Sequence, residues 1–251
     1  MKSISLFFYR LYMILFAVPV MAVCLVLLGA YIFISALTVG EKFTGKAVYI
    51  YNVIISSLIG LKIQTEGNDN IIPGQSYIVV ANHRSNLDPN ILYLALKFDF
   101  RWIMKIELLK IPVFGFICRR MGNIAIDRKN PALAIKSIQE VKKRISNGKC
   151  IAFFSEGTRH NGTGLLPFKK GAFHFAIDAA IPILPVTINY SDLRLPKHSV
   201  DVRAGEVKVI IHKPVETSGR QLSDMPAIEK ITREAILSAL DTSYVNEQPK
   251  S

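Results

Sequence analysis

A histidine and an aspartate lie close together in VVANHRSNLDP, residues 79–89, and such a pair can act as a general base. The apolar run stops at Asn82 and His83, and Asp88 comes five residues after the histidine. On a continuous helix, positions five apart point about 140° away from each other, at roughly 100° per residue. On a turn from a strand to a helix, the carboxylate can instead reach one imidazole nitrogen while the other faces outward.

The chemistry that suits this pair is proton abstraction from a hydroxyl group. A hydroxyl attacks an ester or thioester poorly until a base accepts its proton. A neutral imidazole, with an ordinary pKa of about 6.5, can do this near neutral pH, and an aspartate fixes its tautomer and stabilises the imidazolium. An alternative for Asp88 is a purely structural one, because Asp followed by Pro89 also fits an N-cap and first turn of a helix.

A second polar segment, FSEGTRHNGTGLLPFKKG at residues 154–171, has the composition of a phosphate site. It places Glu156, Arg159, Lys169 and Lys170 around glycines, directly after an apolar run. A guanidinium presents paired donors to phosphate oxygens, glycines let backbone N–H groups approach, and lysines add charge. The same segment could instead be a glycine-rich hairpin turn with ordinary surface cations.

The charge balance favours an anionic partner. The 251 residues include 31 Lys and Arg against 19 Asp and Glu, a net charge of +12. Phosphate head groups, a membrane surface or a nucleic acid would all suit such a chain. The basic residues are not interleaved with aromatic ones in the manner of single-strand binders, so we expect no nucleic-acid partner.

Two uncharged runs near the start predict a membrane attachment. The first holds 30 residues between Arg10 and Glu41, and the second covers residues 47–61. A bilayer-crossing helix needs roughly 20 apolar residues, so the first run is long enough, with room for tilt or for a bend at Pro19. It is also far longer than the apolar core of a cleavable secretory signal, which is the rival interpretation.

We interpret residues 1–64 as a membrane-anchoring helical hairpin and residues 65–251 as the catalytic domain. The hairpin could cross the membrane twice or lie partly in one leaflet. Either way, Lys2, Arg10 and the basic bulk of the chain lie on the same side, which the positive-inside tendency makes the cytoplasm. We therefore expect a cell inner membrane location with the catalytic domain facing the cytoplasm.

The remaining sequence predicts an α/β fold with a mixed, mostly parallel sheet flanked by helices. We expect strands at residues 76–81, 150–154, 183–188 and 206–212. Amphipathic helices are expected at residues 130–148 and from about 226 to 240.

The cysteines and histidines predict no metal site. Cys24, Cys118 and Cys150 form no CxxC pair and no Cys/His cluster at ligand spacing. Neither a disulfide framework nor zinc is expected, and a reducing compartment fits.

Four segments in this order resemble the glycerophospholipid acyltransferase family. NHRSNLD (82–88) is similar to the family's NHxxxxD, and KIELLKIPVFG (105–115) to the segment that contains KxxLxxxPxxG. FSEGTR (154–159) is similar to FxEGTR, with Ser155 where many members carry proline, and IPILPV (181–186) to its apolar proline block. The resemblance covers roughly residues 75–190, and it is strongest to bacterial 1-acylglycerol-3-phosphate acyltransferases.

The resemblance implies acyl transfer from acyl-CoA or acyl carrier protein to the 2-hydroxyl of lysophosphatidic acid. It implies that His83 is the general base and Asp88 its orienting partner, with no cofactor beyond the acyl donor. The implied site for the glycerol phosphate contains Glu156, Gly157, Thr158, Arg159, Lys105 and Arg128.

Other functions stay open on the sequence. The acceptor could be another lysophospholipid or lipid, and a non-catalytic membrane protein that binds anionic lipid is a further alternative. The sequence predicts neither the choice of acyl donor nor the oligomeric state.

Overall fold

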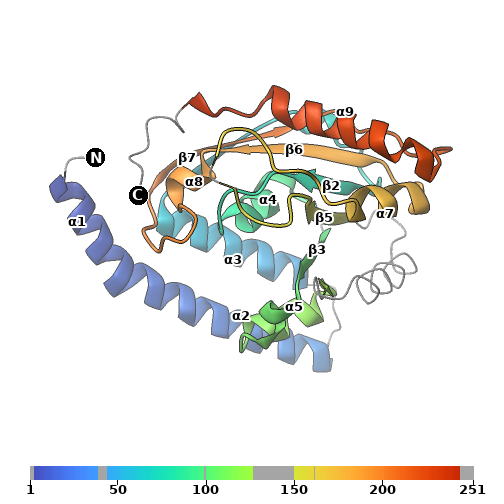
Figure 1. The fold of residues 1–251 in the computed structure, drawn as a ribbon. Helices are drawn as coiled ribbons and strands as arrows, with labels where there is room; N and C mark the ends of the chain where they lie inside the picture. The colour runs from blue at the N-terminus through green and yellow to red at the C-terminus, as the bar shows by residue number, and fades with distance from the viewer. Residues whose placement is uncertain (1–2, 39–43, 99, 127–149, 161, 244–251) are drawn as a thin grey trace.

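The computed structural model describes residues 3–38, 44–98, 100–126, 150–160 and 162–243 (Figure 1). Its helices are α1 Ser3–Tyr12, a π-helical turn Met13–Ala17, α2 Val18–Thr38, α3 Thr44–Ile59, α4 Asp88–Leu96, α5 Phe114–Arg120, α7 Gly171–Ala179, α8 Ser191–Arg194 and α9 Met225–Ser238. Short 3-10 helices are η3 Asn68–Asn70, η4 Ile106–Lys110 and η5 Leu222–Asp224. The strands are β1 Leu61–Glu66, β2 Ile78–Ala81, β3 Phe100–Lys105, β4 Ile124–Ile126, β5 Cys150–Phe154, β6 Ile183–Asn189 and β7 Gly205–Ile211.

Within the described residues, the strands form a seven-stranded sheet in the order β1-β7-β6-β2-β5-β3-β4. Neighbouring strands run parallel, except for β6 and β7, which are antiparallel. This arrangement confirms the predicted α/β fold with a mixed, mostly parallel sheet. The predicted strands correspond to β2, β5, β6 and β7, whereas β1, β3 and β4 have no counterpart in the prediction.

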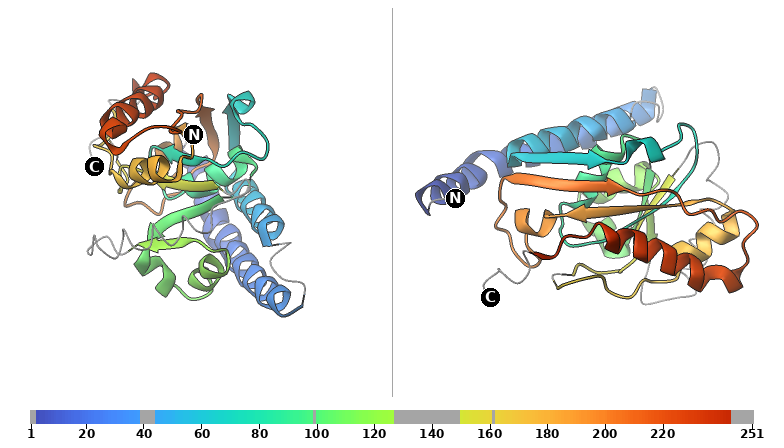
Figure 2. Two further views of the ribbon diagram at one scale, coloured as in Figure 1. Left: turned by 90° about the vertical axis from the view of Figure 1, so that its right-hand side faces the viewer. Right: turned by 90° about the horizontal axis from the view of Figure 1, so that it is seen from above.

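Helices cover both faces of the sheet, and each face has its own hydrophobic core (Figure 2). Strand β2 shows why: Val79 and Ala81 pack with the core that includes α3, α4 and α5, while Ile78 and Val80 pack with α7 and α9. Successive side chains of a strand point to opposite faces. Strands β2 and β6 are therefore buried throughout, as is typical of central parallel strands.

The N-terminal helix runs along the α/β domain and is curved (Figure 1). The π-helical turn Met13–Ala17 ends two residues before Pro19, which has no N–H to donate to a residue one turn earlier. One stripe of the helix, including Ala17 and Ile32, belongs to the hydrophobic core that it shares with the sheet. The helix is thus part of the folded domain, which disfavours its interpretation as a signal that is removed.

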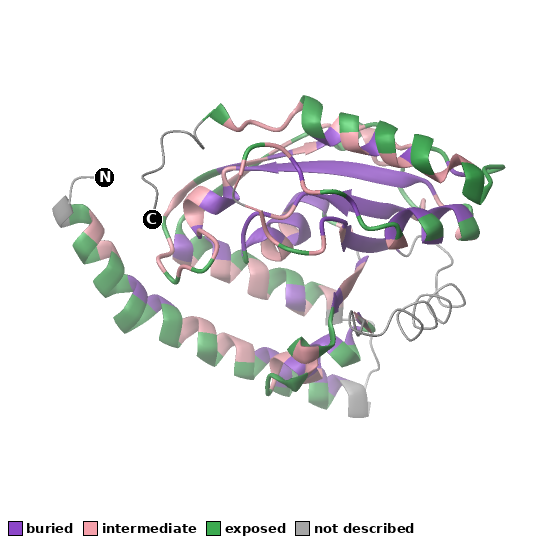
Figure 3. Ribbon diagram, in the orientation of Figure 1, coloured by how far each residue is buried: buried purple, intermediate pink, exposed green. Residues whose placement is uncertain are grey.

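The opposite face of this helix is exposed and apolar (Figure 3). Phe7, Leu15 and Leu27 are each more than 60% exposed, at 63%, 68% and 62%. In the described part of the chain, Ser5–Ser35 is long and apolar enough to cross a membrane by length and composition. Helix α3 returns alongside α2, so the two form the predicted hairpin.

Two details of the prediction need correction, and one lies outside the described residues. The expected boundary after residue 64 falls inside β1, which pairs along its whole length with β7, so the sheet already begins at Leu61. Helix α4 starts at Asp88 as expected, but Leu87 occupies the N-cap position, because the Asp88 carboxylate is held by the preceding loop. The predicted helix at 130–148 lies outside the described residues, and α9 matches the predicted C-terminal helix.

Candidate active site

Adjacent parallel strands bring the predicted site segments together at one edge of the sheet. Ala81 at the end of β2 lies opposite Phe154 at the end of β5. His83 and Glu156 each follow their strand by two residues, and Lys105 ends β3, the neighbour of β5. Since the carboxyl ends of parallel strands meet at the same edge, residues distant in sequence converge there.

The His83 ring and the Asp88 carboxylate are in direct contact. The distance from His83 Nδ1 to Asp88 Oδ2 is 2.7 Å. The histidine side chain is 18% exposed, whereas that of Asp88 is fully buried. The strand-to-helix turn therefore allows the contact that a continuous helix would forbid.

The partners of Asp88 determine the tautomer of His83. Asp88 Oδ2 also accepts hydrogen bonds from the backbone N–H groups of Arg84 at 2.7 Å and Ser85 at 2.8 Å. Because Oδ2 is the acceptor for both of these N–H groups, we infer that it also accepts from His83, so that Nδ1 carries the donated proton. Nε2 then carries the lone pair, on the side of the ring away from Asp88.

Aromatic stacking fixes the plane of the His83 ring. The ring lies on Phe154, with centroids 4.0 Å apart and an angle of 12° between the planes. Phe154 stacks in turn on Trp102, at 5.1 Å. Trp102 packs against the hydrophobic core and also lines the cavity beside His83. The sequence signal for Phe154 was its position as an aromatic residue directly before the glycine-containing turn of the motif.

Glu156 does not occupy the substrate-contacting place that the sequence predicts. Its side chain is buried and does not line the cavity. One carboxylate oxygen accepts the N–H of His83 at 2.9 Å, and the other accepts the N–H of Leu166 at 2.9 Å. Glu156 therefore connects residues 82–87, which we call the histidine loop, to the loop after β5.

Replacing Glu156 with glutamine should destabilise the protein. The amide would turn an N–H₂ group toward a buried backbone N–H, leaving at least one donor unpaired. We expect the free energy of unfolding to fall by about 1–3 kcal/mol, measured as a lower thermal unfolding midpoint. The same change at exposed Glu216 is the control and should have little effect. Equal midpoints for the Glu156→Gln and Glu216→Gln variants would contradict this role.

Arg84 is a site residue that the sequence analysis missed. Its side chain is only 1% exposed, and Nη1 lies 3.4 Å from Asp192 Oδ2. Nη2 donates to the carbonyl of Gly162 at 3.0 Å. The guanidinium thus fastens the histidine loop to α8 and to the loop after β5. Its position next to His83 within the motif was the available signal.

A cavity of about 670 Å³ opens beside His83, a size usual for small-molecule sites. It brings together His83, Lys105, Gly157, Thr158 and Arg159 among the predicted residues. Gly157 has a φ of 73°, which lets the chain turn sharply after β5. Lys105 also forms an ion pair with Glu107. Arg128 lies outside the described residues.

The N-terminal hairpin supplies another wall of the same cavity. Leu25 and Leu28 of α2 and Val48, Tyr51 and Asn52 of α3 line it. The cavity is therefore cationic near Arg159 and apolar near the hairpin. The sequence did not predict that the hairpin takes part in the site.

A partly buried polar network joins the hairpin to the helix that carries Asp88. Asn90 of α4 donates to Asn52 Oδ1 of α3 at 2.7 Å, and Ser56 Oγ donates to Asn90 Oδ1 at 2.8 Å. Asn52 itself donates to the carbonyl of Val48. The network holds α3 against α4 at a point two residues after Asp88. Its signal in the sequence is the presence of two polar residues, Asn52 and Ser56, within the uncharged run 47–61.

Cys118 lines the cavity but is poorly suited to be a nucleophile. Burial raises the pKa of its thiol to about 11, although a hydrogen bond with Asn123 acts in the opposite direction. The reactive thiolate is therefore scarce near neutral pH.

Comparisons with known proteins identify similar chains. The Acyltransferase family model matches residues 62–189. A mouse protein, 1-acyl-sn-glycerol-3-phosphate acyltransferase alpha, is 34% identical over 183 residues, which cover 72% of this chain and 64% of the mouse protein. The 1-acyl-sn-glycerol-3-phosphate acyltransferase of Haemophilus influenzae is 34% identical over 163 residues, 64% of this chain and 67% of that protein. The chain thus spans less than two thirds of the length of the mouse relative.

A solved structure has the same fold. It is the crystal structure of the 1-acyl-sn-glycerophosphate (LPA) acyltransferase PlsC from Thermotoga maritima, with a TM-score of 0.78 and 23% identity. The match covers 100% of both chains, including the N-terminal helices.

Proposed function

Because this chain belongs to the acyltransferase family whose model it matches, we propose that it acylates the 2-hydroxyl of 1-acyl-sn-glycerol-3-phosphate to give phosphatidic acid. The observation that carries the proposal is the His83–Asp88 contact of 2.7 Å at the wall of a cavity that also contains Arg159. The names of the relatives support the choice of acceptor.

In the proposed mechanism, His83 acts as a general base. Nε2 accepts the proton of the lipid hydroxyl while its oxygen attacks the carbonyl carbon of the acyl thioester. The tetrahedral intermediate collapses with cleavage of the carbon–sulfur bond, and the thiolate takes the proton back from the imidazolium. Asp88 stabilises the imidazolium and keeps Nε2 unprotonated at the start.

Arg159 is proposed to bind the phosphate of the acceptor, together with Lys105 and Thr158. A guanidinium can make two parallel hydrogen bonds to phosphate oxygens. All three side chains line the cavity that contains His83. Arg128 remains a proposed contributor on the family resemblance alone.

Replacing Arg159 with alanine should chiefly raise the KM for lysophosphatidic acid. Loss of a charge-assisted contact of about 1.5–3 kcal/mol corresponds to at least about tenfold in affinity. Steady-state kinetics at varied acceptor concentration measure this effect. Exposed Lys170, which lies in the same segment but does not line the cavity, gives the matched control Lys170→Ala. An unchanged KM for the Arg159→Ala variant would remove Arg159 from the phosphate site.

We further propose that the hairpin attaches the protein to one leaflet of the inner membrane, with the catalytic domain in the cytoplasm. Arg10 on α1 forms an ion pair with Asp201, and Gly29 on α2 lies against Val113. These two attachment points are about 28 Å apart along the helix, close to the thickness of the hydrocarbon core of about 30 Å. A helix that keeps both contacts lies along the domain, which supports attachment to one leaflet over a bilayer crossing.

A substrate panel tests the proposed activity. The purified full chain in detergent is offered lysophosphatidic acid and other lysophospholipids, each with acyl-CoA or acyl carrier protein, and products are identified by mass. We expect phosphatidic acid as the main product, with at least one of the two donors. Transfer to a different lysophospholipid in preference, or binding without transfer from either donor, would contradict the proposal.

A further inference from the structure

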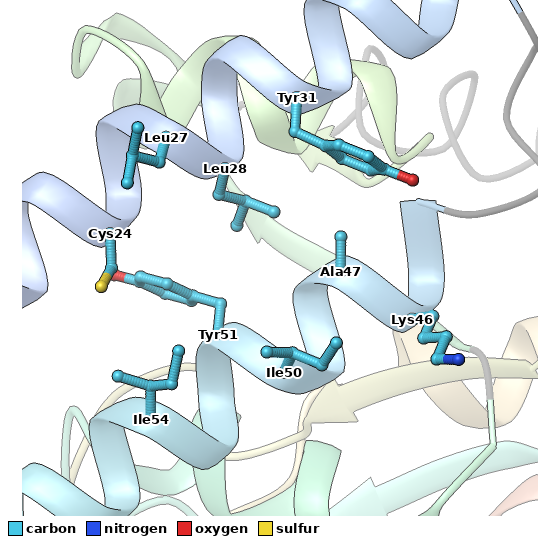
Figure 4. Close-up of a pocket in the computed structure, with 9 residues that line it drawn as sticks. All are labelled: Cys24, Leu27, Leu28, Tyr31, Lys46, Ala47, Ile50, Tyr51 and Ile54. Atoms are coloured by element: carbon cyan, nitrogen blue, oxygen red, sulfur yellow. The ribbon is translucent and has the colours of Figure 1, made fainter.

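A second cavity lies between α2 and α3 (Figure 4). Its volume is about 400 Å³, and we call it the outer groove. Cys24, Leu27 and Tyr31 line it from α2, and Ile50 and Ile54 line it from α3. Leu27 is 62% and Ile50 49% exposed, so the groove opens onto the apolar surface of the hairpin.

The outer groove and the active-site cavity share part of one wall. Leu28 and Tyr51 line both of them. On α2, Leu25 lines only the active-site cavity and Cys24 only the groove, so Leu28 lies where the two meet. Figure 4 shows Leu28 directed into the space between the helices and the hydroxyl end of Tyr51 beside Cys24. A single layer of side chains therefore separates the groove from the active-site cavity.

The proposed reaction needs room for two alkyl chains. The acyl donor and the acceptor lipid each carry one, and both reacting groups must meet at His83. A cavity of about 670 Å³ is within the range that holds one drug-sized ligand. With the head of the acceptor at Arg159, two apolar directions are open to its tail: the interior end around Ile117 and Met121, and the hairpin residues such as Leu28.

We propose that the tail of the acceptor lipid leaves the active-site cavity between α2 and α3 and lies in the outer groove. This inference rests on the proposed function and adds the path of the lipid to it. Rotation of the Leu28 and Tyr51 side chains opens the passage. The tail then stays in the apolar surface of the hairpin while the head group reaches His83, so the lipid need not leave the bilayer completely.

Filling the passage should impair long-tailed acceptors more than short-tailed ones. For the Leu28→Trp variant, kcat/KM is measured with oleoyl and with hexanoyl lysophosphatidic acid in the same mixed micelles. The ratio of the oleoyl to the hexanoyl value should fall about tenfold, as expected when about two methylenes lose their apolar contacts. Ile54→Trp, which narrows the groove from α3 without lining the active-site cavity, should lower the ratio in the same direction.

Val26→Trp is the matched control, because Val26 is exposed on α2 and lines neither cavity. Its ratio should equal that of the unaltered protein. An unchanged ratio in folded, active Leu28→Trp and Ile54→Trp variants would overturn the path between the helices. Absence of transfer to either acceptor by the unaltered protein would instead overturn the proposed function.

A photoreactive lysophosphatidic acid tests the path without turnover. With a diazirine at the end of its tail, the probe should label the outer groove at positions such as Leu27 and Ile50, and unlabelled oleoyl lysophosphatidic acid should compete. Labelling confined to the interior end of the active-site cavity, around Ile117 and Met121, would overturn the proposal.

Discussion

Replacing His83 with alanine is expected to reduce the rate of acyl transfer by about 10²–10⁴-fold, the usual contribution of a general base. The reason is the geometry of the ring: Nδ1 is held by Asp88 at 2.7 Å, and Phe154 stacks on its face. Nε2 is thus presented to the cavity in one orientation. Alanine retains the backbone N–H that donates to Glu156, so the loop should keep its connection.

The measurement is kcat with saturating substrates, together with the thermal unfolding midpoint. The unfolding midpoint of the His83→Ala variant should stay close to that of the unaltered protein, whereas its kcat should fall. His174, which is exposed on α7, provides the control variant His174→Ala, and its activity should match that of the unaltered protein. Full activity in the His83→Ala variant would exclude His83 as the base.

Replacing Arg84 with leucine is expected to lower the free energy of unfolding by about 3–5 kcal/mol, the usual cost of breaking a buried charge pair. Leucine would leave the carboxylate of Asp192 buried beside an apolar group. It would also remove the hydrogen bond to the carbonyl of Gly162. A chain of this size should then melt roughly 10 °C lower.

Thermal unfolding in detergent measures this change, with Arg220→Leu as the control. Arg220 is exposed, so its replacement should shift the midpoint little. Similar midpoints for the Arg84→Leu and Arg220→Leu variants would mean that the buried guanidinium contributes little to stability.

Three of the four strands that the sequence predicts are recognisable because their burial is visible locally, and the fourth, β7, is recognisable from its β-branched residues. Strands β2, β5 and β6 are apolar runs because both faces of the sheet are covered there. Strand β1, LKIQTE, alternates buried and exposed positions, and β3, FRWIMK, contains two cations. Their place in the sheet depends on pairing with distant strands, so the local composition does not reveal them.

In the candidate site too, a contact between residues close in sequence can be predicted, whereas contacts between distant residues cannot. His83 and Asp88 are five residues apart, and the turn between them can be predicted from the pattern of strand and helix signals. The pairing of Arg84 with Asp192 joins positions 108 residues apart. The buried position of Glu156 likewise depends on the loop that His83 begins, and the contribution of α2 and α3 to the cavity depends on tertiary packing.

The hydrogen bonds among Asn52, Asn90 and Ser56 couple the position of α3 to that of α4, the helix that begins at Asp88. In the proposed attachment to one leaflet, α3 contacts the hydrocarbon on one side and is hydrogen-bonded to α4 on the other, at Asn90, two positions after Asp88. Lateral pressure that tilts α3 would therefore also move α4, and it would change the contact between the Asp88 carboxylate and the His83 ring. We therefore expect turnover to respond to how tightly the surrounding lipids are packed.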